Sequence, residues 1–144
     1  MSRAERPGRG AFRAWRPLTL RWDDNDVFGH VNNVRYYALI DTTVCGHLIE
    51  AGAFSPHEGP LGFVVDSGCT YYDGIAFPDA IEGALAVERI GTSSVRYRVG
   101  VFRQGAAEAA AAGHFTHVYV DRATRRPLDA LPARLRETVE ALAV

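Results

Sequence analysis

The sequence contains no lysine, only two cysteines and no long apolar run, and these shortages exclude several classes of protein. No segment approaches the roughly 18 apolar residues of a membrane-spanning helix. The 16 basic residues, all arginine, are balanced by 17 acidic residues, so no broad basic field points to nucleic acid or to a membrane surface. The exclusive use of arginine reflects the coding bias of the source more than a functional demand.

Cys45 and Cys69 match no zinc-binding or redox spacing. Two thiols in a chain of this size predict reduced packing residues and a cytoplasmic location, although the sequence leaves a disulfide between them open. Residues 1–17 carry five arginines among glycine and proline but no continuous apolar segment, which argues against a secretory signal. We expect a flexible basic N-terminal extension at 1–17, with a transit peptide as the alternative, and one domain over 18–144.

Residues 31–51 have the apolar spacing of a helix, and Gly52 supplies a stop. Because further apolar side chains widen the stripe until much of the circumference is apolar, we expect this helix to be largely enclosed. The stripe consists of residues at steps of three and four: Val34, Tyr37, Ile40, Val44 and Leu48.

After residue 80 the apolar period changes to two, which predicts half-buried strands joined by tight turns. The alanines between 106 and 112 could equally be helical, but Gly113 and the β-rich residues after it favour a strand. We expect strands at 18–22, 61–73, 81–88, 94–101 and 109–121, and an amphipathic helix at 131–144. One antiparallel sheet of about five strands, wrapped around the long helix, would bury all the apolar faces, so the expected fold class is α+β.

The densest polar stretch is "WDDNDVFGHVNN" at residues 22–33, directly before the expected helix. Its acids suggest a calcium loop, but Phe28 and Arg35 occupy positions where an EF-hand needs oxygen ligands. Zinc or thiol chemistry elsewhere is disfavoured, because histidines three apart on a strand face opposite sides and a Cys and a His two apart on a helix diverge. These pairs are His114 with His117 and Cys45 with His47.

The same stretch has a structural and a functional interpretation. As a structural feature, one Asp or Asn32 caps the helix, which contributes roughly 1 kcal/mol. Capping does not require a second acid, a histidine and two consecutive asparagines. A functional site would offer Asp24 or Asp26 as a base or nucleophile and the unpaired N–H groups of the helix start as oxyanion stabilisers, the groups needed for acyl transfer.

The segment "DNDVFGHVNNVRYYALID" resembles the signature of the hotdog-fold acyl-CoA thioesterases, the 4-hydroxybenzoyl-CoA thioesterase-like superfamily. The segments "GTSSVRYRVGVFRQG" and "THVYVDRATRRPLDALP" also resemble the later strands and the tail of this family, so the resemblance covers nearly the whole chain from about Leu18. It implies a hotdog fold and hydrolysis of an acyl-CoA thioester to a free acid and CoA, without a cofactor or a metal.

Within this resemblance, Asp26 matches the catalytic carboxylate, which acts as a base on water or as a nucleophile that forms a mixed anhydride. Asp24 matches a more structural acid. His30 matches a histidine that positions Asp26 or the water, or that only forms hydrogen bonds at the helix start. The plant-type acyl-ACP thioesterases have an Asn where this chain has Phe28, so the bacterial acyl-CoA enzymes are the better match.

The resemblance also implies a homodimer or homotetramer, with the site at the interface beside the partner's second strand. Tyr37 would line the acyl channel or pack in the core, and a late arginine turn would meet the CoA phosphates or face solvent. The expected substrate-binding residues are Gly29, Val31, Asn33, Tyr37, Val64, Val65 and Ser67, and the arginines are Arg122, Arg125 and Arg126. The alternatives are an acyl-ACP thioesterase, a non-catalytic acyl-CoA-binding module, or a dehydratase, which would normally pair a histidine and an acid differently.

Overall fold

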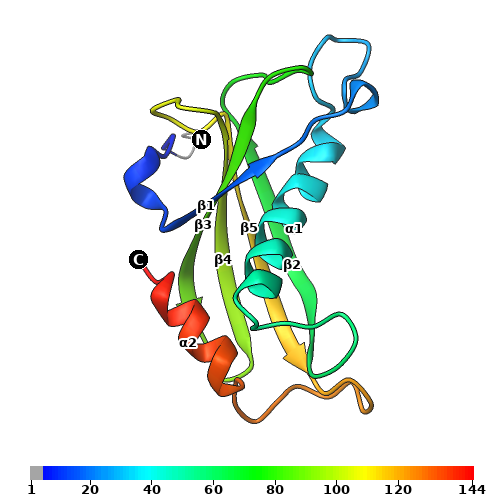
Figure 1. Ribbon diagram of the computed structural model, residues 1–144, viewed down its shortest axis with the longest axis vertical. Helices are drawn as coiled ribbons and strands as arrows, with labels where there is room; N and C mark the ends of the chain where they lie inside the picture. The colour runs from blue at the N-terminus through cyan, green and yellow to red at the C-terminus, as the bar shows by residue number, and fades with distance from the viewer. Residues whose placement is uncertain (1–4) are drawn as a thin grey trace.

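The computed structural model describes residues 5–144, which form one curved sheet and two α-helices (Figure 1). The helices are α1 (Asn33–Glu50) and α2 (Ala133–Ala141), and two short 3-10 helices lie at Arg9–Ala11 and Trp22–Asp24. The strands are β1 (Ala14–Leu18), β2 (Leu61–Tyr71), β3 (Ile81–Ile90), β4 (Ser94–Arg103) and β5 (Ala111–Val120).

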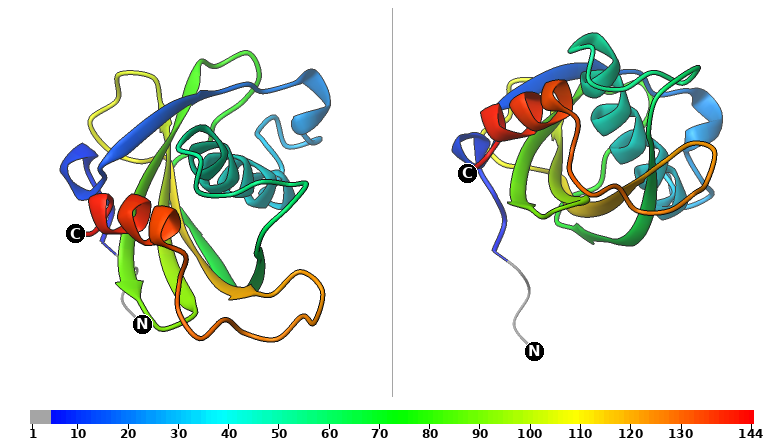
Figure 2. Two further views of the ribbon diagram at one scale, coloured as in Figure 1. Left: turned by 60° about the horizontal axis from the view of Figure 1, so that its bottom comes forward. Right: turned by 90° about the horizontal axis from the view of Figure 1, so that it is seen from below.

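The strands pair antiparallel in the spatial order β1-β3-β4-β5-β2, so β1 and β2 form the two edges of the sheet. The sheet curls around α1, which lies in its hollow in both views of Figure 2. The expected α+β hotdog architecture, an antiparallel five-stranded sheet around a long helix with a short C-terminal helix, is therefore confirmed.

The main core lies between the inner face of α1 and the concave face of the sheet. Ile40, Val44 and Leu48 are buried there against side chains of β3, β4 and β5. The helix approaches β5 closely at Gly113, where an added Cβ would lie 2.9 Å from Ile40 Cδ1. The helix α2 packs its Leu135 and Val139 into the same core.

The N-terminal segment differs from the prediction. The first strand spans Ala14–Leu18 and pairs with β3, whereas the sequence predicted it at 18–22, and the proposed boundary after residue 17 falls inside this strand. Phe12 is buried in a small cluster with side chains of β3 and β4. Its ring and the Trp15 ring both pack edge-on against Phe102. Residues 1–4, the start of the expected extension, lie outside the described residues.

The helix α1 is less enclosed than predicted. In the single chain, Val34 is 69% exposed and Tyr37 is 37% exposed, although both belong to the predicted apolar stripe. The stripe is wide enough to extend beyond what one sheet covers. The exposed residues of this face of α1 are Val34, Tyr37, Ala38 and Asp41.

Candidate active site

Asp24 holds the loop before α1 in place. The side chain is only 7% exposed, and its Oδ2 accepts a hydrogen bond from the Arg21 N–H at 2.7 Å. Its backbone carbonyl accepts the Asn32 N–H at 2.9 Å, and the guanidinium groups of Arg21 and Arg35 lie 3.6 and 3.8 Å from its Oδ1. With both oxygens occupied in this way, Asp24 has a structural role.

Asp26 sits in a tight turn, two residues further along. The Gly29 N–H donates to the Asp26 carbonyl oxygen at 3.1 Å, and the Asp26 N–H donates to the His30 carbonyl oxygen at 3.0 Å. This turn needs a positive φ, which Gly29 supplies with a φ of 85°. The carboxylate accepts the Phe28 N–H on Oδ1 at 2.8 Å and the Asn32 side-chain amide on Oδ2 at 3.2 Å. Asp26 is therefore half-buried and oriented by two donors.

The start of α1 leaves the backbone N–H of Asn33, the residue after Asn32, unused. The Asn32 side chain caps the helix by accepting the Val34 N–H at 2.9 Å, and the Asn32 carbonyl accepts the Arg35 N–H at 2.9 Å. Within residues 5–144, the Asn33 N–H has no hydrogen-bond partner. An unpaired N–H at a helix N-terminus is suited to stabilising negative charge on an oxygen.

A pocket of about 310 Å³ opens at this end of the helix, and its walls include His30, Asn33, Tyr36, Tyr71 and Gly74. The Tyr71 hydroxyl donates to the Asn33 carbonyl oxygen at 3.3 Å, and burial raises the pKa of Tyr71, so the phenol stays a donor. The His30 ring lies over Gly74, where an added Cβ would be 2.6 Å from His30 Cδ2. His30 thus lines the pocket, and in the described part of the chain its ring makes no hydrogen bond to Asp26.

The other expected substrate-binding residues lie before and on α1 and on the edge strand β2. Val31 is buried in the core and also lines the pocket. Tyr37 stacks on Phe115 with a centroid separation of 6.3 Å. Val64, Val65 and Ser67 are exposed on β2, and none of them lines the pocket beside His30 in the same chain.

The arginine turn follows β5 and lies at the other end of α1 from the loop that precedes this helix (Figure 1). The Arg122 guanidinium donates to the carbonyl oxygens of Ser55, Glu58 and Gly59 at 3.0, 3.1 and 2.8 Å, so it secures the loop before β2. The Arg125 guanidinium lies 5.6 Å from the centre of the Phe63 ring. Within one chain, this turn and Asp26 do not share a site.

Sequence reasoning missed two features of the site. It gave one Asp or Asn32 as the helix cap, but it did not predict that the Asn32 amide also donates to Asp26, although the two consecutive asparagines were the available signal. It missed Tyr71, because the contact with Asn33 joins positions 38 residues apart and leaves no local pattern.

The chain belongs to the thioesterase-like superfamily, whose family model matches residues 20–139. This membership confirms the expected enzyme class, a thioester hydrolase. A search of curated proteins found no match.

Solved structures agree with this fold. The PA5185 protein of Pseudomonas aeruginosa strain PAO1 is 46% identical, with 96% of this chain and 97% of that chain covered and a TM-score of 0.93. A thioesterase from Thermus thermophilus, solved with coenzyme A and Zn, is 25% identical over 92% of this chain and 95% of that chain, with a TM-score of 0.72. The PA2801 protein of Pseudomonas aeruginosa is 23% identical over 89% and 98%, with a TM-score of 0.79, and supports the fold alone.

Residues 5–144 bring together no group of three or more His, Cys, Asp or Glu side chains that could hold a metal ion. Both cysteines, Cys45 and Cys69, are free thiols. No helix in the described part of the chain is long and apolar enough to cross a membrane.

Proposed function

We propose that this protein hydrolyses acyl-CoA thioesters and that Asp26 is its catalytic carboxylate. One observation supports this most directly: the Asp26 carboxylate accepts a hydrogen bond from the Asn32 side chain, and the unpaired N–H belongs to the next residue, Asn33. A base or nucleophile and an oxyanion donor are the two groups that acyl transfer requires in close proximity. The CoA-bound relative from Thermus thermophilus supports CoA as the carrier.

The chemistry follows from these two groups. The Asn33 N–H donates to the thioester carbonyl oxygen and stabilises the charge that develops on it. As a base, Asp26 takes a proton from water, the hydroxide adds to the carbonyl carbon, and the C–S bond breaks to release CoA thiolate, which takes up a proton. As a nucleophile, Asp26 itself adds to the carbonyl, the thiolate leaves, and water then hydrolyses the mixed anhydride.

His30 and Tyr71 line the same pocket as Asn33, whose N–H is the proposed oxyanion donor. The His30 ring and the Tyr71 side chain belong to the same pocket, so they position the thioester or the water at Asp26. Val31 and Asn33 form part of the same wall, and Gly29 shapes the turn that precedes it. Within this proposal His30 is a positioning residue.

The test is steady-state hydrolysis of a panel of acyl-CoA thioesters, with the released thiol followed colorimetrically. Asp26→Asn keeps the size and the hydrogen-bonding shape but removes the charge, and we expect kcat to fall by roughly a thousandfold or more. Asp23→Asn is the matched control, because Asp23 is an exposed acid three residues earlier. Full activity of Asp26→Asn, or no CoA release from any member by the wild type, would contradict the proposal. An acyl group on Asp26 in rapidly quenched enzyme would distinguish the nucleophile from the base.

A second copy of the chain completes the site in this proposal. The apolar side chains Phe63, Val64 and Val65 are exposed on the edge strand β2. An unpaired apolar edge is a surface for pairing with another strand. Two copies joined along β2 would place the partner's Val64 and the partner's Ser67 towards the active site of the first copy. The arginine turn of the second copy would lie on the same side.

Sedimentation at micromolar concentration tests this assembly. We expect the wild type to form at least a dimer. The Val65→Arg variant puts a charge at the centre of the exposed edge, so we expect this variant to be a monomer with the same fold. Lys substitution of the exposed Val144, which lies away from β2, is the control. A monomeric wild type would contradict the shared site.

A further inference from the structure

The imidazole of His117 is a buried polar group without a complete set of hydrogen bonds. His117 is 3% exposed, and its Nε2 has no hydrogen-bond partner within residues 5–144. Nearly all buried polar atoms in folded proteins have a partner, and an unpaired one points to a bound group. His117 has no part in the proposed catalysis at Asp26.

The neighbouring tyrosines determine which nitrogen carries the proton. The Tyr97 and Tyr119 hydroxyl oxygens lie 2.6 Å apart, and the Tyr119 hydroxyl lies 3.4 Å from His117 Nδ1. If Tyr97 donates to Tyr119 and Tyr119 donates to Nδ1, both hydroxyl protons are used. The reverse order would leave the Tyr97 proton without an acceptor in the described structure, and Tyr97 is fully buried.

The Nε2 atom is therefore an N–H donor that lacks an acceptor. Burial lowers the pKa of His117 to about 4, so the ring is neutral at ordinary pH and donates one hydrogen bond, not two. The missing partner is an oxygen that can accept a hydrogen bond.

A small cavity of about 20 Å³ lies beside this ring, between α1 and the sheet. Its walls are Cys45, Leu48, Phe54, Gly62, His117 and Tyr119. Gly62 leaves room for the two polar rings, since a Cβ there would lie 2.9 Å from Tyr119 Cε1 and 3.0 Å from His117 Nδ1. The cavity has the size of one water molecule or one hydroxyl group.

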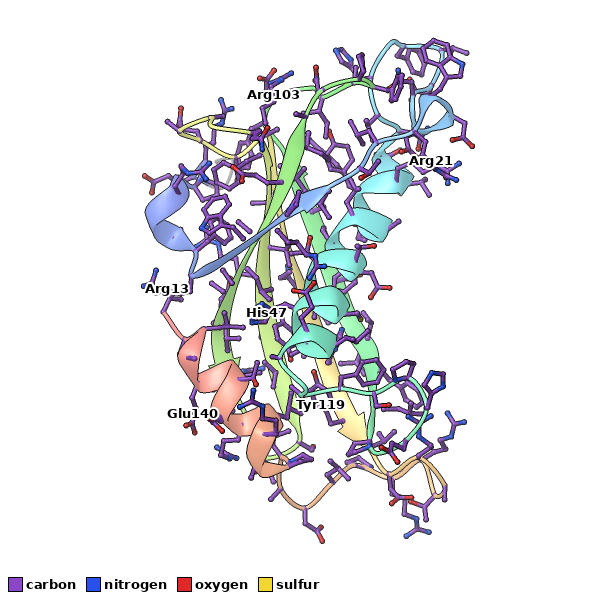
Figure 3. All side chains as sticks on the ribbon, viewed as in Figure 1. Arg13, Arg21, His47, Arg103, Tyr119 and Glu140 are labelled. Carbon is purple, nitrogen blue, oxygen red and sulfur yellow. The ribbon has the colours of Figure 1, made fainter. Side chains whose placement is uncertain are left out.

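A row of side chains lies between the cavity and the active-site end of α1. Phe115, His117 and Tyr119 alternate along β5 on the face towards α1, and Tyr37 stacks on the first of them. From Asn33 to Cys45 the helix rises about 18 Å. Figure 3 shows Tyr119 near the C-terminal end of α1, with Arg21 near the opposite end, beside the Asp26 loop.

We propose that this cavity is a distal subsite of the acyl channel and that it binds an uncharged oxygen, a hydroxyl or carbonyl, near the far end of a long acyl chain. This inference rests on the proposed acyl-CoA hydrolysis and specifies its substrate class. The His117 Nε2–H donates to this oxygen, which by itself fills the cavity.

The charges around the cavity select a neutral group. Asp41 is exposed on the same side of α1, where its Oδ1 accepts the Cys45 thiol proton at 3.6 Å. Burial raises the pKa of Cys45 to about 11, so the thiol stays neutral and the Asp41 carboxylate is the nearby charge. A terminal carboxylate on the acyl chain would be repelled by Asp41.

The test compares three acyl-CoA substrates of equal chain length: unsubstituted, ω-hydroxy and ω-carboxy. We expect wild-type kcat/KM to be about tenfold higher for the ω-hydroxy chain than for the unsubstituted one, the effect of one added hydrogen bond, and lowest for the ω-carboxy chain. His117→Phe should remove the preference, and His117→Gln should retain part of it, since the Gln amide also offers a donor.

His114→Phe is the matched control, because His114 lies on the same strand but faces the other side of the sheet, where it contacts Asp66 at 2.9 Å. That variant should keep the ω-hydroxy preference. Calorimetric binding of a free ω-hydroxy fatty acid to wild type and His117→Phe gives a readout without turnover, with thermal unfolding as a check of the fold.

The possible outcomes separate the two proposals. Equal rates for hydroxylated and plain chains, with equal binding, would overturn the subsite and leave a structural water in the cavity. Absence of hydrolysis for every substrate would overturn the proposed function, while the binding experiment would still test the subsite.

Discussion

The side-chain amide of Asn32 donates a hydrogen bond to Asp26 Oδ2 at 3.2 Å. The carbonyl oxygen of the same side chain accepts the Val34 N–H at 2.9 Å and so caps α1. One side chain therefore orients both the proposed catalytic carboxylate and the first turn of the helix that holds the proposed oxyanion donor. If Asp26 is catalytic, activity and stability are coupled at Asn32.

Substitution can separate these two roles. Asn32→Ser keeps a good helix cap but removes the amide donor, so we expect kcat to fall by about 10- to 100-fold with little change in stability. Asn32→Ala removes both functions and should also lower the free energy of unfolding by about 1 kcal/mol. Steady-state kinetics and urea unfolding measure the two effects. Unchanged kcat in Asn32→Ser would show that the contact with Asp26 does not matter for turnover.

His117 should make the stability of the protein depend on pH. Its folded-state pKa is lowered to about 4 from an unfolded value of 6.5, so between these values the unfolded chain binds the additional proton. The contribution to stability is full above pH 6.5 and falls as the pH drops towards 4, by up to about 3 kcal/mol. Urea unfolding across this range should show a shallower pH slope for His117→Phe than for the wild type, and an identical slope would contradict the burial effect.

Gly113 allows the close packing of α1 on β5. An added Cβ would lie 2.5 Å from the Gly68 carbonyl oxygen and 2.9 Å from Ile40 Cδ1. Gly113→Ala should therefore destabilise the fold by about 1 to 3 kcal/mol. Gly10→Ala, at a position with no neighbour within 4 Å, is the control and should change the thermal midpoint little. Equal midpoints for the two variants would show that the sheet adjusts freely at Gly113.

Two arginines of the arginine turn are expected to have different roles, Arg122 in holding a loop and Arg126 in binding CoA. Because the Arg122 guanidinium holds carbonyl groups of the loop at 55–59, Arg122→Lys should increase proteolysis in that loop and lower stability, with KM for acyl-CoA unchanged. Arg126 is exposed, and Arg126→Ala should raise KM several-fold at low salt if it meets the CoA phosphates. A raised KM with normal proteolysis in Arg122→Lys would reverse these assignments.

Local sequence patterns were sufficient for much of the fold. The period of two at 81–101 and the helical spacing after residue 31 predicted β3, β4 and α1, because a strand or a helix repeats its burial over neighbouring residues. The first strand was misplaced, since the alternation of apolar and polar residues in "LTLRW" is typical of a strand. Pairing of Ala14–Leu18 with β3 and the burial of Phe12 decided between them.

The contacts of the candidate site and of His117 also separate into local contacts and long-range contacts. The sequence by itself determined the Asp26 turn, the Asn32 cap and the start of α1, because all of these contacts join residues within a few positions of one another. The contacts of Tyr71, Arg122 and His117 were decided only by the tertiary structure. They depend on strand register and on the packing of α1 over β5, which bring distant segments together and which no local pattern of side chains specifies.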